Sequence, residues 1–117
     1  MSPLARIERE PIPPGTLDML ILKTLSGAPP RELHGFEIAD HIQRGSRDVL
    51  QVEEGSLYPA LQRMLVKGWI SGEWSRTAEN RRARYYRLTT AGKRQLEREL
   101  ASYQRVVQAI ALILQPS

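Results

Sequence analysis

The sequence predicts a small, mainly α-helical fold that contains a small β-hairpin and ends in a long helix. Apolar residues recur at helical spacing in three successive segments, two short segments then alternate in polarity, and the final segment carries an apolar seam with heptad spacing. The chain has 117 residues, which is enough for one domain with one modest core. It has no cysteine, which excludes a disulfide framework and a thiolate metal site.

Residues 1–15 are rich in proline, and we expect them to form an irregular N-terminal arm. The arm mixes arginine with glutamate and lacks the apolar core of a signal peptide. No apolar run approaches the roughly 18 residues that a membrane span needs. We therefore expect a soluble chain in the cytoplasm, with no membrane partner. The net charge of +4 and the pI of about 9.9 are weak evidence for an anionic partner, because ordinary surfaces often carry excess Lys and Arg.

The first predicted helix covers residues 16–26 and is apolar around nearly its whole circumference, through Leu17, Met19, Leu20, Ile21, Leu22 and Leu25. A helix of this kind is buried on several sides, so we expect it to be central. The second predicted helix covers residues 34–46. Its inward stripe consists of Ile38, Ala39 and Ile42, with Phe36 beside them.

The third predicted helix begins at Ser56, a favourable N-cap, and ends at Gly68, a natural C-terminal cap. This start places Pro59 in the first turn, where backbone N–H groups have no intrahelical partner and proline costs little. The inward positions follow the helical pattern i, i+4, i+7 and i+8, and they are Leu57, Leu61, Met64 and Leu65.

Two short strands follow, at residues 69–75 and 84–89, and we expect them to pair as a hairpin. A long helix then covers residues 90–114, with Thr90 as its N-cap.

Three helices followed by a hairpin form the layout of a winged helix-turn-helix domain, in which the second and third helices are the helix-turn-helix pair. We assign residues 16–88 to this domain and residues 89–117 to a C-terminal dimerisation helix.

The exposed face of the third helix holds the first group of candidate DNA contacts. In a helix-turn-helix protein the N-terminal end of this helix enters the major groove. Serine and tyrosine hydroxyls can bond phosphates, proline can pack on sugar or a thymine methyl, glutamine can read adenine, and arginine can read guanine. An ordinary surface helix with a capping turn would show the same local pattern, so that alternative stays open. The candidates are Ser56, Tyr58, Pro59, Gln62 and Arg63.

The hairpin holds the second group, because it concentrates arginine: Arg76, Arg81, Arg82, Arg84 and Arg87. Only Glu79 opposes them, whereas a solvated loop normally mixes charges of both signs. Such a projection suits contact with phosphates or insertion into a minor groove. A flexible charged loop is the alternative. Because the hairpin follows a helix-turn-helix pattern, we interpret it as a DNA-binding wing.

The last helix carries the dimerisation candidates at spacings of 4, 3, 4, 3 and 4 residues: Leu96, Leu100, Tyr103, Val107, Ile110 and Leu114. This seam covers about three heptads, which is the threshold for predicting a coiled coil. The alternative is a helix that lies on its own domain. A small winged domain has little surface left to cover so long a helix, and we therefore favour homodimerisation.

The sequence gives little support for an enzyme. His34 and His41 flank Glu37 and would share one helical face, which could in principle bind a metal. Such a set on an exposed face is more often solvated. The sequence contains no glycine-rich phosphate loop, nucleophile elbow or carboxylate constellation. We expect no catalytic activity, no metal and no cofactor.

Four stretches of the sequence together resemble the PadR family of bacterial transcriptional regulators. The resemblance covers about residues 16–100 and is carried by "TLDMLILKTL", "HGFEIADHI", "GSLYPALQRMLVKGWI" and "RYYRLTTAGKRQL", of which "GSLYPAL" is the specific signal. It implies a winged helix-turn-helix homodimer that represses transcription from a palindromic operator. It also implies a small aromatic effector, as some relatives sense such compounds at the dimer interface.

The resemblance assigns roles to residues as well. It places the start of the recognition helix at Ser56, Tyr58 and Pro59, the wing strand at Arg84, Tyr85 and Tyr86, the start of the dimer helix at Thr89, Thr90 and Gly92, and a phosphate contact at His34 and Gly35. Two departures matter: Phe36 lacks the hydroxyl of the tyrosine that relatives often have, and we expect a single C-terminal dimerisation helix, as in the short form of the family. Tyr103 is the only aromatic residue of this last helix.

The sequence therefore predicts a DNA-binding transcriptional regulator that acts as a repressor. The alternative is a winged-helix module that dimerises and binds another protein, because a fold does not fix a function. The arginine-rich hairpin favours DNA.

Overall fold

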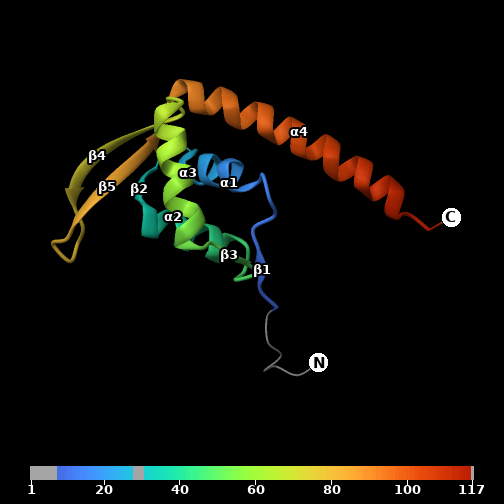
Figure 1. Cartoon of the computed structure of the whole chain (residues 1–117), viewed down its shortest axis with the longest axis horizontal. Helices are drawn as coiled ribbons and strands as arrows, with labels where there is room; N and C mark the ends of the chain where they lie inside the picture. The colour runs from blue at the N-terminus through green and yellow to red at the C-terminus, as the bar shows by residue number, and fades with distance from the viewer. Residues whose placement is uncertain (1–7, 28–30, 117) are drawn as a thin grey trace.

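The computed structural model describes residues 8–27 and 31–116 and shows three helices packed together, with a hairpin and a long helix projecting to opposite sides (Figure 1). No helix in these two ranges has the length and hydropathy to cross a membrane. In chain order the elements are β1 (Glu10–Pro11), α1 (Leu17–Leu25), β2 (Glu32–His34), α2 (Gly35–Gly45), β3 (Leu50–Gln51), α3 (Glu54–Val66), β4 (Ile70–Arg76), β5 (Arg82–Leu88) and α4 (Thr90–Leu114).

The central position predicted for the first helix is confirmed. Ile21, Leu22 and Leu25 of α1 have no exposed surface, and α1 contacts α2, α3 and α4. The predicted inward residues Ile38 of α2 and Leu61 of α3 complete this core. Burial of so many apolar side chains around one helix is the main source of stability in a domain of this size.

The described structure has more strands than the predicted hairpin, and they form two sheets. β2 pairs antiparallel with β5, which pairs antiparallel with β4, and β1 pairs in parallel with β3. The expected arm is therefore not irregular throughout, since Glu10 pairs with Leu50. The sequence pattern missed β1, β2 and β3 because strands of two or three residues are too short to show an alternation.

The start of α3 differs from the prediction. The helix begins at Glu54 with Glu53 as its N-cap, because the N–H groups of Ser56 and Leu57 already donate to the carbonyl of Glu53 at 3.0 Å. Pro59 consequently lies in the second turn, where it removes a hydrogen bond to the carbonyl of Gly55. That carbonyl belongs to an exposed residue, so water can satisfy it.

The C-terminal end of α3 agrees with the prediction. Gly68 has φ of +75°, its N–H donates to the carbonyl of Leu65 at 3.1 Å, and the N–H of Trp69 donates to that of Met64 at 3.0 Å. These two bonds form a Schellman motif, which turns the chain into β4.

The root of α4 is fixed against this same turn. Its N-cap is Thr89, one residue before the predicted Thr90, because the Thr89 hydroxyl accepts the N–H of Gly92 at 3.0 Å and donates to the carbonyl of Gly68 at 2.6 Å. A side chain on Gly92 would collide with the backbone carbonyl of Trp69. The helix therefore leaves the body in one direction and continues past it (Figure 1).

Candidate DNA-binding surface

A groove of about 420 Å³ lies between the start of α2, the exposed face of α3 and the β4–β5 hairpin, which we call the wing. It brings together seven of the predicted contacts: His34, Gly35, Tyr58, Gln62, Arg81, Arg82 and Arg84. Six other predicted contacts lie outside its lining: Ser56, Pro59, Arg63, Arg76, Tyr85 and Arg87. The groove is also lined by residues that were not predicted as DNA contacts, among them Phe36, Trp74 and Tyr86.

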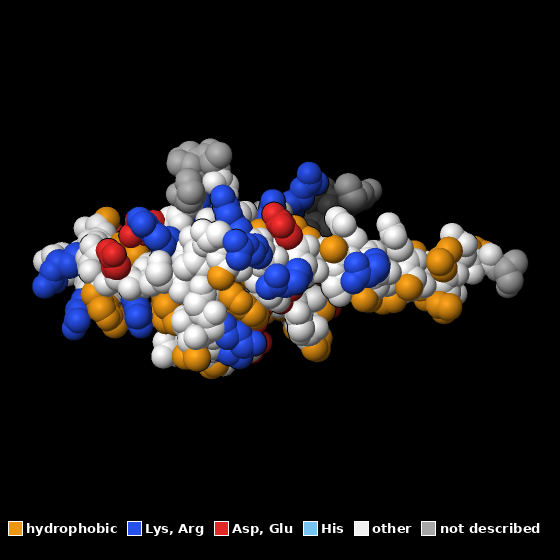
Figure 2. All heavy atoms as spheres, turned by 90° about the horizontal axis from the view of Figure 1, so that it is seen from above, with side chains coloured by type: hydrophobic (Ala, Val, Ile, Leu, Met, Phe, Trp, Pro, Cys, Tyr) orange, Lys and Arg blue, Asp and Glu red, His pale blue; other side chains and the backbone are white. Residues whose placement is uncertain are grey.

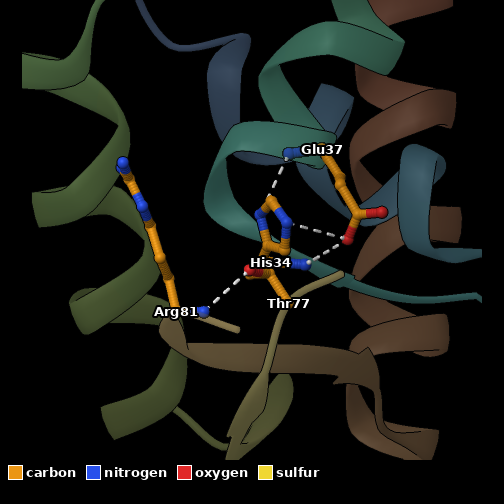
Figure 3. Close-up of polar contacts among 4 residues, drawn as sticks. All are labelled: His34, Glu37, Thr77 and Arg81. Atoms are coloured by element: carbon orange, nitrogen blue, oxygen red, sulfur yellow. Dashed lines mark hydrogen bonds and ion pairs between the residues drawn. The ribbon is translucent and has the colours of Figure 1, made fainter. Parts of the chain in front are cut away.

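The start of α2 is ordered by a reciprocal cap. The N–H of Glu37 donates to Nδ1 of His34 at 3.4 Å, and the carboxylate of Glu37 accepts the N–H of His34 at 3.1 Å (Figure 3). The His34 ring also lies edge-on to Tyr85, with centroids 5.3 Å apart. The imidazole thus has a structural role, and it stands beside a helix N-terminus, which is a favourable place for a phosphate.

Tyr58 locks the two helices of the helix-turn-helix together. A Cβ on Gly35 would lie 3.1 to 3.3 Å from Cε1, Oη and Cζ of Tyr58, so the tyrosine ring lies across the first residue of α2. Tyr58 remains 49% exposed at the groove. The aromatic residue in "GSLYPAL" therefore sets the packing of α3 on α2 and also offers a surface to a ligand.

The exposed face of α3 divides into two sides. Gln62 lies one turn after Tyr58 and lines the groove with it. Arg63 is turned toward α1, where its Nη2 lies 2.6 Å from Oδ1 of Asp18. Both predicted base readers are exposed, but only Gln62 belongs to the groove, whereas Arg63 has a carboxylate partner within the protein.

Phe36 corrects a further expectation. It is 72% exposed at the groove and does not pack beside the inward residues Ile38 and Ile42. The helix begins at Gly35, and at about 100° per residue Phe36 points nearly opposite to Ile38 and about 120° away from Ile42. The predicted helix, residues 34–46, already contained Phe36, so the helical spacing itself places this residue off the inward stripe.

The arginines of the wing have different partners. Arg87 pairs with Glu32 at 3.0 Å, and Arg76 donates to the carbonyl of Asn80 at 3.1 Å. Arg81 donates its backbone N–H to the Thr77 hydroxyl at 3.2 Å, as Figure 3 shows, and its side chain is exposed.

The remaining two wing arginines, Arg82 and Arg84, lie over Trp74. Figure 2 shows Lys and Arg side chains at this end of the molecule, as well as over its middle. The groove is therefore bordered by positive charge on the wing side, which suits a phosphate backbone.

Burial affects one titratable group of the groove. The pKa of Tyr86 is raised because its phenol is desolvated by burial; the positive charge of Arg84 opposes the rise, and Tyr58 adds to it. Tyr86 is therefore neutral at physiological pH and serves as an apolar floor under the arginines.

The predicted dimerisation seam is split by the structure. Leu96 is buried in the domain's own core, and Leu100 packs partly against it. Beyond them α4 extends away from the body, and the outer seam residues Tyr103, Val107, Ile110 and Leu114 are 43–76% exposed. Hydrophobic side chains follow one side of α4 to its end (Figure 2).

The two histidines do not share a site. His34 lines the groove, whereas His41 is exposed and borders a different hollow with Lys23 and Arg44. Within residues 8–27 and 31–116, no three His, Cys, Asp or Glu side chains cluster as a metal site would require.

Helices α2 and α3 and the wing form a winged helix-turn-helix domain, and the groove between them is its candidate DNA-binding surface. The particular family follows from comparison with known proteins. The model of the transcriptional regulator PadR-like family matches residues 21–98, which is more than half of the chain, and the chain belongs to that family.

Solved structures share the fold. A transcriptional regulator from Clostridium thermocellum superposes with a TM-score of 0.76 at 23% identity, over 86% of this chain and 95% of that one. A PadR family transcription regulator from Clostridium difficile has a TM-score of 0.71 at 29% identity, over 86% of this chain and 100% of that one. Bacillus subtilis PadR, solved with operator DNA, has a TM-score of 0.64 at 24% identity, over 76% of this chain and 48% of that one.

Proposed function

We propose that this regulator binds double-stranded DNA through the groove and acts as a homodimeric repressor on a palindromic operator. The observation that carries the proposal is the convergence of the α2 N-terminus, the α3 face and the free arginines of the wing on one groove. The fold shared with Bacillus subtilis PadR, which was solved with operator DNA, supports it. Because its target is genomic DNA, we place the protein in the cytoplasm.

The homodimer is supported by the outer half of α4. Tyr103, Val107 and Ile110 expose apolar surface that would be costly to leave in water. A second copy packed on this side would bury it. A two-fold axis there would place two winged domains on half-sites about one helical turn, roughly 34–36 Å, apart.

The proposal also includes a small aromatic effector that releases the regulator from its operator. A hollow of about 310 Å³ lies between α1 and α4 and is lined by Met19, Tyr103 and Val106, among others. This hollow borders the proposed dimer surface, so a ligand there would bear on the geometry of the two domains. A screen of small phenolic and aromatic compounds for loss of operator binding tests this part.

The wing provides the direct test of DNA binding. In one triple variant, Arg81, Arg82 and Arg84 are all changed to alanine. Its affinity for duplex DNA is measured at several salt concentrations. We expect weaker binding to all sequences and a log–log salt slope smaller by about 0.9 for each phosphate that the variant no longer neutralises. Arg87→Ala is the control, because Arg87 is already paired with Glu32.

An unchanged slope with unchanged affinity would remove the wing from the interface. A wild-type protein that binds no duplex at low salt would favour the alternative function, a winged helix that binds a protein. Selection of bound fragments from the source genome, carried out with the wild type, supplies the operator sequence.

A further inference from the structure

Trp74 is the large exposed aromatic residue of the wing, at 58% exposure. In the strand register it stands opposite Arg84, and Arg76 stands opposite Arg82. Side chains two residues apart on a strand share a face, so Trp74 projects on the same side as Arg82 and Arg84. The root of this face carries the buried residues Ile70 and Tyr86, and its outer part forms a wall of the groove.

The indole ring holds the two guanidinium groups. Cζ of Arg82 lies 4.5 Å from the ring centroid, and Cζ of Arg84 lies at 6.0 Å. Both distances are within the range in which a cation is attracted to an aromatic face. Gly72 makes room for this arrangement, since a Cβ there would lie 2.7 Å from Nε of Arg84.

A ring differs from a carboxylate as a partner for these arginines. In the described part of the chain, neither Arg82 nor Arg84 has an acidic side chain within ion-pair distance, whereas Arg87 has Glu32 and Arg63 has Asp18. A carboxylate would neutralise the guanidinium and occupy its N–H donors. The indole face restrains a guanidinium but leaves its charge and its edge donors free for an anion.

We propose that Trp74 is a positioning residue of the wing, which holds the Arg82 guanidinium at the edge of the groove so that it meets a DNA phosphate already ordered. This inference rests on the proposed function. An arginine that is free in solution loses rotamer freedom when it binds, and ordering it beforehand lowers that cost. Arg81 is the adjacent residue and provides the comparison, because no aromatic contact orders its side chain in the described structure.

The test is a double-mutant cycle on the full chain, with affinity measured for a mixed-sequence duplex of about 30 base pairs, long enough for two half-sites. Trp74→Leu removes the aromatic face and keeps apolar bulk. We expect it to weaken binding about 2- to 5-fold per wing when Arg82 is present. In the Arg82→Ala background the same change should have a clearly smaller effect, because only the more distant Arg84 then remains over the ring.

Two further measurements separate ordering from a general change of the wing. In the Arg81→Ala background, Trp74→Leu should weaken binding as much as in the wild type. The salt slope should fall by about 0.9 per neutralised phosphate for Arg82→Ala and stay unchanged for Trp74→Leu, because the arginine still meets its phosphate. Trp74→Phe should bind with intermediate affinity, since phenylalanine is the weaker cation–π partner. Thermal unfolding of each variant checks that the exposed position leaves the fold intact.

Equal weakening by Trp74→Leu with arginine or alanine at position 82 would show that the indole acts on DNA or on the wing directly, and would overturn the inference. So would wild-type affinity for Trp74→Leu. In both cases the wild type still binds DNA, and the proposed function stands. A wild type that binds no duplex overturns the proposed function and this inference with it.

Discussion

At the scale of single residues, the same residue type has different roles according to its partner. Arg87 and Arg63 are paired with carboxylates, whereas Arg82 is stacked on Trp74. Exposed ion pairs contribute little to stability, about 0–1 kcal/mol each, but they determine which charges remain available to a ligand. The number of arginines on a surface therefore overstates its capacity to bind phosphate.

The ion pair between Asp18 and Arg63 gives a prediction about whether Arg63 is available to bind DNA. Asp18→Asn removes the partner of Arg63 and should raise affinity for duplex several-fold, because one arginine per subunit is released on α3. The free energy of unfolding should fall by no more than about 1 kcal/mol, since half of the Arg63 side chain is exposed. Affinity is measured by fluorescence anisotropy with labelled duplex.

The matched control for this prediction is Glu97→Gln, which removes the same charge from an exposed position of α4. Equal gains in the two variants would mean that net charge, rather than release of Arg63, raises the affinity. Arg63→Ala should in turn abolish the gain from Asp18→Asn.

Glu99 of α4 gives a prediction about pH. Burial raises the pKa of its carboxyl, and the nearby Asp18 raises it further, while Gln95, Lys67 and Arg98 oppose the rise. One of its oxygens, Oε2, is buried and has no hydrogen-bond partner in the described structure. Because the folded state binds this proton more tightly than the unfolded state does, ionisation of Glu99 costs stability, and the cost appears as pH rises above the ordinary glutamate value.

Glu99→Gln should therefore raise the melting temperature at pH 7, and the gain should shrink as pH falls toward the ordinary pKa of glutamate and disappear below it. Thermal unfolding at several pH values measures it. Glu97→Gln is again the control, because Glu97 is exposed. A gain that is independent of pH would show that Glu99 is not the titrating group.

At the scale of elements, junctions are fixed by a few backbone contacts. The start of α4 depends on the Thr89 cap and on the absence of a side chain at Gly92. Gly92→Ala would press a methyl group against the backbone carbonyl of Trp69, which cannot rotate away. We expect a loss of about 1–3 kcal/mol in the free energy of unfolding, typical of overpacking.

Gly55→Ala is the matched control for this substitution. A Cβ at Gly55 meets no atom within 4 Å, so alanine there should stabilise α3 by about 0.4–1 kcal/mol through helix propensity and chain entropy. Urea unfolding followed by circular dichroism measures both variants. If Gly92→Ala were as stable as Gly55→Ala, α4 would not be anchored by this contact.

The sequence predicted the longer elements and the layout, because periodicity reports burial over several turns. It also predicted Gly68 as the end of α3, because few residues other than glycine adopt its backbone conformation easily. The start of α3 was predicted three residues late, because Glu53 caps the helix through its backbone alone and leaves no side-chain signal. The short strand β2 was missed for lack of length.

The candidate site was predictable only in part. The cluster of arginines in the hairpin sequence predicts a basic projection, and seven predicted residues do line one groove. Which arginines are already paired depends on contacts across the fold, such as Arg63 with Asp18, 45 positions apart in the chain. Trp74 was assigned to a strand but not to the site, because its neighbours become apparent only when the strand register is known.

At the scale of the whole molecule, the wing and the outer half of α4 project from opposite sides of the body (Figure 1). The principal extents of 55 × 38 × 28 Å reflect this elongation. Lys and Arg side chains lie at the wing end, and hydrophobic side chains follow one side of the outer half of α4 (Figure 2). We infer that dimerisation through this side of α4 sets the distance between two groove surfaces, although α4 itself need not touch a base.

Substitutions in the outer half of α4 test whether dimerisation there sets the distance between the two grooves. Val107→Glu and Ile110→Glu, made together, would bury two charges per subunit against apolar partners in a dimer, and dissociation avoids that cost. Both side chains are about half exposed in the monomer, so the winged domain should keep its melting behaviour apart from the loss of the dimer. Sedimentation should show a lighter species, and tight operator binding should be lost while weak non-specific binding through the wing persists.

The control is Ala101→Glu with Gln108→Glu, which adds the same charges to exposed positions off the seam and should leave a dimer. Leu100 is unsuitable because it packs against the domain's own core. A folded Val107→Glu, Ile110→Glu variant that stays dimeric and binds its operator as the wild type does would remove the outer half of α4 from the dimer interface, and the spacing of the half-sites would then have to come from another surface.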